Sequence, residues 1–125
     1  MKNKILLIVG IVYGLIFINA GLNKFLNYMS MPEDLPQEAI DTMDTILKIE
    51  WLMPLIAVVE IVGGLLFMIS KFRALGAVIL FPIGVGIVMT HLINIPSGLP
   101  LALILFAVLL WVIYENRAKY TQMIT

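Results

Sequence analysis

The sequence has no cysteine among its 125 residues. Disulfide bonds, thiolate metal ligands and dithiol redox chemistry are therefore excluded within this chain. The sequence is also poor in charge: Asp, Glu, Lys and Arg make up 13% of the residues, and the net charge is zero. Soluble proteins have about twice that share of charged residues. Because nucleic-acid binding depends on an excess of basic residues, the composition excludes nucleic acid as a partner.

Hydrophobic residues are what the sequence has in excess. They make up 62% of the chain, against about 45–50% in soluble domains, and the mean hydropathy is +1.06. This composition predicts an integral membrane protein whose main partner is the lipid bilayer. The length suits one membrane domain, residues 1–125.

Four apolar stretches have roughly the length that crosses a bilayer as a helix. They cover about residues 5–28, 51–70, 74–93 and 99–114. A cleaved signal peptide is the alternative interpretation of the first stretch. Ile18-Asn19-Ala20 lacks the small-x-small cleavage pattern, so a retained helix is favoured. The sequence predicts an all-α fold, a bundle of four transmembrane helices.

A hydrophilic stretch separates the first two apolar segments. Pro36 suits the first turn of a helix, and Ile40, Met43 and Leu47 recur at helical spacing. We therefore expect a short amphipathic helix at about 36–49. Two interpretations stay open: a helix lying on the membrane surface, or a lid over a pocket. The acidic residues of the stretch are Glu33, Asp34, Glu38, Asp41, Asp44 and Glu50.

The basic residues predict the orientation in the membrane. Lys48 is the one basic residue clearly in the loops of one side, whereas six fall on the other: Lys2, Lys4, Lys71, Arg73, Arg117 and Lys119. Because cytoplasmic loops are rich in Lys and Arg, both termini are predicted to be cytoplasmic and the helix at 36–49 extracytoplasmic. The predicted location is the bacterial plasma (inner) membrane.

Glu60 is the residue that most needs an explanation. A lone acid inside a membrane span costs several kcal/mol unless it is paired or protonated. Lys24 lies at a similar depth and is a candidate partner, although it could instead extend to the interface. The polar residues of the spans all fall in the outer half, which predicts a shared outward-facing pocket. The candidate ligand-binding residues are Glu60, Lys24, Asn23, Asn19, His91 and Asn94.

Each of these residues also has a purely structural interpretation. Glu60 could be neutral and hydrogen-bonded to an asparagine, Asn19 and Asn23 could join helices, and His91 could be an interfacial residue. A single histidine without cysteine predicts no metal site. A stripe of small residues, Gly10, Gly14 and Gly21, favours close helix packing.

Three motifs give the sequence a resemblance to the DoxX family. Gly21-Leu22-Asn23-Lys24-Phe25 resembles its G-x-x-K-hydrophobic signature, and the segment Glu60–Leu66 resembles its E-x-x-G-G motif. Thr90-His91 matches a histidine near the end of the third span. The resemblance implies a four-helix membrane fold related to a subunit of a quinol-linked oxidoreductase, and it directs attention to Lys24, Glu60 and His91.

Two functions are compatible with this pattern. In the first, the bundle binds a small amphipathic ligand, a quinone or a lipid, in the outward pocket, or serves as an accessory subunit of a membrane redox complex. The alternative is a non-catalytic assembly factor that packs against partner helices. Catalysis by this chain alone is not expected. The sequence shows no evident cofactor site, and a quinone is the one cofactor that remains possible. Membrane oxidoreductase subunits or further copies of the chain are the protein partners considered.

Overall fold

A computed structural model describes residues 2–26 and 35–124. Within these ranges every regular element is a helix, which confirms the all-α prediction. Residues 27–28 of the first predicted span, and Glu33 and Asp34 of the acidic stretch, lie outside the described ranges. The helices are α1 Lys2–Leu26, α2 Gln37–Lys48, α3 Leu52–Met68, α4 Arg73–Ile93, the 3-10 turn η1 Pro96–Gly98, α5 Leu99–Glu115 and α6 Arg117–Thr121.

Three helical stretches are long and apolar enough to cross a membrane: Lys4–Leu26, Arg73–Ile93 and Pro96–Glu115. A fourth candidate arises if α2 and α3, which meet at an angle of 95°, are taken as one bent unit. α3 alone has 17 residues and is about 25 Å long at 1.5 Å per residue, near the lower limit for a span. The protein is therefore an all-helical membrane protein with three to four candidate spans.

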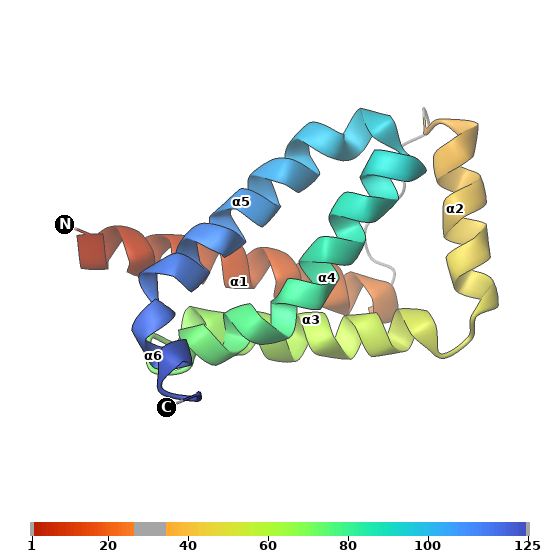
Figure 1. Cartoon of the computed structure of the whole chain (residues 1–125). Helices are drawn as coiled ribbons and strands as arrows, with labels where there is room; N and C mark the ends of the chain where they lie inside the picture. The colour runs from red at the N-terminus through yellow and green to blue at the C-terminus, as the bar shows by residue number, and fades with distance from the viewer. Residues whose placement is uncertain (1, 27–34, 125) are drawn as a thin grey trace.

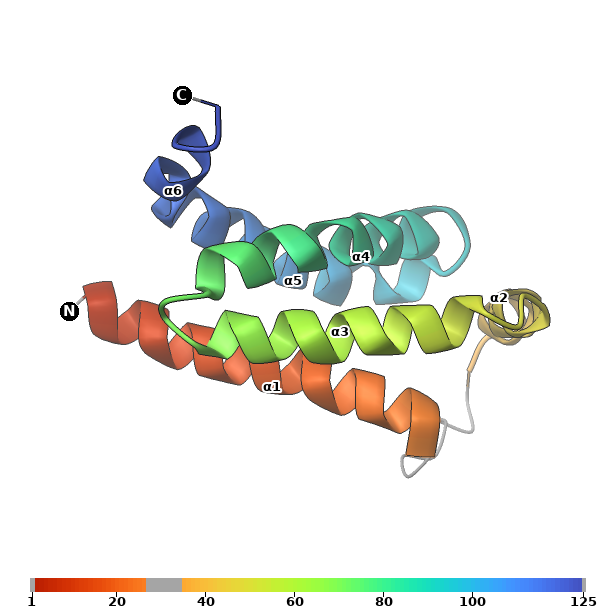
Figure 2. The ribbon, with the colours of Figure 1, turned by 90° about the horizontal axis from the view of Figure 1, so that it is seen from below.

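The long helices form two layers. Figure 2 shows α1 and α3 side by side in one layer, with α4 and α5 in the other. The main contacts run in the order α1–α3, α3–α4 and α4–α5. The start of α1 and the short α6 lie at one end of the molecule, and α2 lies across the opposite end (Figure 1). We call the end with the start of α1 and α6 the terminal end, and the opposite end the α2 end.

Glycines allow α1 and α3 to approach closely. A Cβ atom added to Gly14 would overlap the carbonyl oxygen of Gly64, and one added to Gly64 would lie 2.7 Å from the carbonyl oxygen of Gly14. Further along, a Cβ atom on Gly21 would lie 2.7 Å from the carbonyl oxygen of Ala57. The predicted small-residue stripe of α1 is therefore the surface that packs on α3.

An aromatic residue links the two layers. Tyr13 of α1 is buried, and its ring centroid lies 4.8 Å from that of Phe67 on α3. Its hydroxyl donates a hydrogen bond of 2.8 Å to the carbonyl oxygen of Leu105 on α5. The hydrogen bond satisfies the hydroxyl inside an apolar core, where an unpaired polar group would be costly.

Arg73 caps the C-terminal end of α3. Its Nε donates to the carbonyl oxygen of Phe67 at 2.9 Å and its Nη2 to that of Met68 at 3.3 Å. These carbonyls belong to the last turn of α3, where no further helical N–H groups are available. The side chain is only 5% exposed and lies against Gly10 of α1. Arg73, assigned from the sequence to a basic turn, therefore points inward.

The C-terminal segment, predicted only as a polar tail, contains the helix α6. Tyr120 donates a hydrogen bond of 2.8 Å from its hydroxyl to the carbonyl oxygen of Ala74 at the start of α4. Partial burial raises the pKa of Tyr120 above its usual value of 10.0, so the neutral, donating form is favoured. This contact holds α6 beside the connection between α3 and α4.

Candidate functional site

The structure joins two of the predicted site residues across two helices. Lys24 of α1 and Glu60 of α3 form an ion pair with 2.6 Å between Nζ and Oε1. The pair lies one turn from the contact between Gly21 and Ala57, where the two backbones nearly touch. Because residues three apart share one side of a helix, this close approach aims the amine at the carboxylate.

The two members of the pair are buried to different extents. The side chain of Glu60 is 3% exposed and that of Lys24 is 25% exposed. Among the described residues, Oε1 of Glu60 has no hydrogen-bond donor other than this amine. The ion pair therefore provides the compensation that a carboxylate in a membrane span requires, and it fastens α1 to α3.

The two asparagines of α1 lie close to the pair along the helix. Asn19 is exposed and Asn23 is half-buried, next to Lys24 in the sequence. The ligand-binding role predicted for both residues stays a prediction.

His91 does not join the ion pair. Its Nδ1 lies 2.8 Å from the carbonyl oxygen of Ile87, one turn earlier in α4. Because a carbonyl oxygen only accepts, Nδ1 carries the proton and donates this bond. The ring also lies against Gly98 of η1, where a side chain would collide with it. The sequence predicts a shared pocket for Lys24, Glu60 and His91. The structure brings Lys24 and Glu60 into contact, whereas His91 contacts Ile87 and Gly98 instead.

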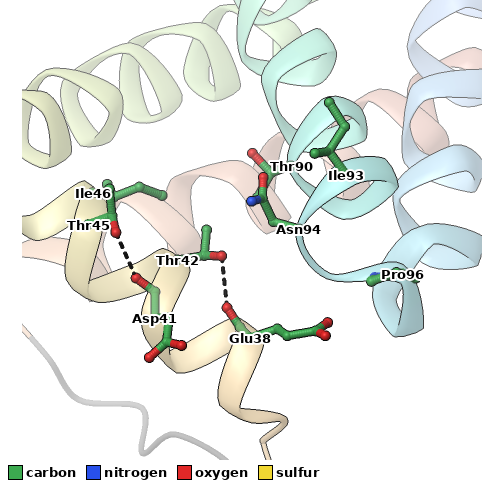
Figure 3. Close-up of a pocket in the computed structure, with 9 residues that line it drawn as sticks. All are labelled: Glu38, Asp41, Thr42, Thr45, Ile46, Thr90, Ile93, Asn94 and Pro96. Carbon is green, nitrogen blue, oxygen red and sulfur yellow. Dashed lines mark hydrogen bonds between the residues drawn. The ribbon is translucent and has the colours of Figure 1, made fainter.

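A polar pocket of about 650 Å³ lies between α2 and the end of α4, as Figure 3 shows. Among the predicted site residues, Asn94 lines it, whereas Glu60 does not. Thr42 and Thr45 donate from their hydroxyls to the carbonyl oxygens of Glu38 and Asp41, at 2.8 and 2.9 Å. The nine lining residues are Glu38, Asp41, Thr42, Thr45, Ile46, Thr90, Ile93, Asn94 and Pro96.

The α2 side of this pocket was missed at the sequence level. The apolar positions at 36–49 predict the amphipathic helix but say nothing of its polar face. The polar residues Glu38, Thr42 and Thr45, with Asp41, also recur at helical spacing, and that was the available signal. α2 does form a pocket wall, as the lid interpretation requires. The opposite wall is α4, however, and not the surroundings of Glu60.

The geometry suits ligand binding better than metal binding. Within the described part of the chain, no three Asp, Glu or His side chains are grouped closely enough to hold a metal ion. The pocket instead combines two carboxylates with threonine hydroxyls, one amide and three apolar side chains. Such a lining can accept hydrogen bonds from a polar head group and contact the start of an apolar tail.

The family of this chain follows from its similarity to known proteins. Neither the curated proteins nor the solved structures contain a match to this chain. The model of the DoxX family matches residues 5–92. This range extends from α1 almost to the end of α4 and includes Lys24, Glu60 and His91. The chain therefore belongs to the DoxX family of integral membrane proteins.

Proposed function

We propose that this protein binds the head group of a small amphipathic molecule, a quinol or an amine-bearing lipid, in the pocket between α2 and α4. The observation that carries the proposal is the polar pocket of about 650 Å³ at the α2 end of an otherwise apolar bundle. Small-molecule sites in proteins usually measure about 300–1,000 Å³.

The chemistry of the lining selects the kind of head group. The carboxylates of Glu38 and Asp41 disfavour a ligand of net negative charge. Oδ1 of Asp41 already accepts a hydrogen bond of 2.9 Å from Nε2 of Gln37, so Glu38 is the freer acceptor of the two. The hydroxyls of a reduced quinone, or an ammonium group, would donate to them. The amide of Asn94 can accept or donate on the opposite wall. A donor-rich head group therefore fits better than a free anion.

An apolar flank beside the pocket suits the tail of such a ligand. Leu92 and Ile93, on the last turn of α4, are 54% and 65% exposed, and Ile93 also lines the pocket. A ligand with its head in the pocket could lay its tail along this flank and remain in lipid. The resemblance to a subunit of a quinol-linked oxidoreductase supports a quinol, and an accessory role in a membrane redox complex is the setting we propose.

Native mass spectrometry of the protein released from its membrane, followed by titration with a soluble quinol, tests this proposal. The Glu38→Gln/Asp41→Asn variant should lose at least about tenfold in affinity, because a hydrogen bond to a charged group contributes about 1.5–3 kcal/mol. Asp44→Asn is the matched control: Asp44 lies exposed on the same helix, outside the pocket lining.

Two results would count against ligand binding at this pocket. Equal quinol affinity in the wild type and the double variant would place any site elsewhere. A wild-type protein that carries no quinol or lipid adduct and appears at twice the subunit mass would support the alternative function, an assembly factor that packs against partner helices.

A further inference from the structure

An apolar groove runs between α1 and α5, away from the α2 pocket. It measures about 360 Å³ and is lined by α1 side chains from Ile8 to Ile16, with Leu105 and Val108 from α5. Tyr13 contributes its ring, while its hydroxyl is occupied by the carbonyl oxygen of Leu105. The groove therefore offers apolar contact and no free polar group from this tyrosine.

The side chains of the groove favour a flexible hydrocarbon chain over a protein helix. Helices pack closely in lipid where small residues let the backbones approach. The glycines Gly10, Gly14 and Gly21 of α1 all lie against Arg73 or α3, on a different side from the groove. The groove itself is lined by branched residues such as Val12, Ile16 and Val108. A narrow acyl chain can follow such a surface, whereas a second helix would be held away from it.

The end of the molecule beyond the groove is basic. Lys4 lies one turn before Ile8 on α1, and α6, which follows α5, carries Arg117 and Lys119. Figure 1 shows the start of α1 and α6 at this same end. Glu115 is the only acidic residue in the segments 1–12, 66–76 and 109–125. Positive charge therefore prevails at the end of the molecule that holds the start of α1 and α6.

One of these charges makes two local contacts at the end of α5. Nη1 of Arg117 donates to the carbonyl oxygen of Tyr114 at 2.9 Å, and its guanidinium lies 4.2 Å from the centroid of the Tyr114 ring. A guanidinium fixed over an aromatic ring loses little freedom on contacting a phosphate, which it recognises through several donors.

We propose that the α1/α5 surface binds one anionic phospholipid. Its acyl chain lies in the groove between Ile8 and Val108, and its phosphate lies near Lys4, Arg117 and Lys119. This site is separate from the pocket at the α2 end, so either can exist without the other.

The test is native mass spectrometry of the whole protein in mixed micelles that contain equal amounts of phosphatidylglycerol and phosphatidylethanolamine. The wild type should retain one phosphatidylglycerol preferentially. Val12→Trp, which fills the groove, should abolish this retention. Leu65→Trp, on an exposed position of α3 outside the groove, should not change it. Lys4→Gln/Arg117→Gln/Lys119→Gln should lower the preference by about fivefold for each charge removed.

Several outcomes would overturn the proposal. Equal loss of lipid in Val12→Trp and Leu65→Trp would mean annular lipid only. An unchanged preference in the triple variant would remove the head-group site, and this variant leaves the apolar core intact, so it remains informative if Val12→Trp fails to fold. A dimer that excludes lipid from the groove would identify a second copy as the occupant.

Discussion

Lys24 and Glu60 meet across two helices, but they do not share the burial equally. Glu60 is 3% exposed and Lys24 25%. Lys24→Met should therefore lower the free energy of unfolding more than Glu60→Gln does. The first leaves a buried carboxylate without its partner, a loss of about 3–5 kcal/mol for buried pairs. The second leaves an amine that can extend to the interface, which limits the loss to about 1–2 kcal/mol. Chemical unfolding in micelles measures both.

A double-mutant cycle completes this test. The combined Lys24→Met/Glu60→Gln variant should be more stable than Lys24→Met alone, because no unpaired carboxylate then remains. Lys24→Arg serves as the control that keeps the charge. If Glu60→Gln is the more damaging single change, then the carboxylate has stabilising partners besides Lys24, and the pair does not have the role described above.

The sequence predicts the contacts of single residues where these depend only on the depth of the residue in the membrane. Lys24 and Glu60 fall at matching depths on helices that pack directly, so their pairing was predictable. His91 also has a suitable depth, but depth says nothing of the direction around the helix, and its ring lies against Gly98. Arg73 was missed because a basic residue beside a turn usually faces water; here the free carbonyls of α3 draw it inward.

Among whole elements, the close approach of α1 and α3 depends on having no side chain at Gly14. Gly14→Ala should destabilise the protein by about 1–3 kcal/mol, because its Cβ would overlap the carbonyl oxygen of Gly64 and push the helices apart. Gly86→Ala is the matched control in α4, where an added Cβ meets nothing within 4 Å. It should be neutral or stabilising by up to about 1 kcal/mol. Thermal unfolding of both variants, compared with the wild type, measures the difference.

A loss of stability in Gly86→Ala as large as that in Gly14→Ala would contradict this account. It would show that the glycines act through contacts outside the single chain, and not through the α1–α3 contact.

The elements themselves were largely predictable, because hydrophobic length and helical spacing are local properties. The amphipathic helix expected at 36–49 is α2, Gln37–Lys48, and the span expected at 74–93 is α4, Arg73–Ile93. α3 is shorter than the predicted span at 51–70, since it starts after Trp51 and ends at Met68, where Arg73 closes it. The short α6 escaped prediction because its docking depends on the distant contact of Tyr120 with Ala74.

For the whole molecule, the order in which helices pack could not be read from the sequence. Apolar surface faces lipid as readily as another helix, so composition does not say that α1 packs chiefly on α3, with α4 and α5 forming a second layer (Figure 2). The lateral position of α2 is equally non-local. That position puts its polar side opposite Asn94 and creates the pocket.

The absence of cysteine allows a clean test of how the molecule sits in the membrane. The start of α1 and α6 share one end, while α2 lies at the other (Figure 1), and the excess of Lys and Arg favours a cytoplasmic terminal end.

A thiol introduced by Asp44→Cys in α2 should therefore react with a membrane-impermeant maleimide in intact cells. One introduced by Gln122→Cys, after α6, should react only after permeabilisation. Both positions are exposed, so a difference in labelling reports sidedness. Labelling of both from the same side would mean an even number of crossings between α2 and α6, whereas the predicted arrangement has three, α3, α4 and α5.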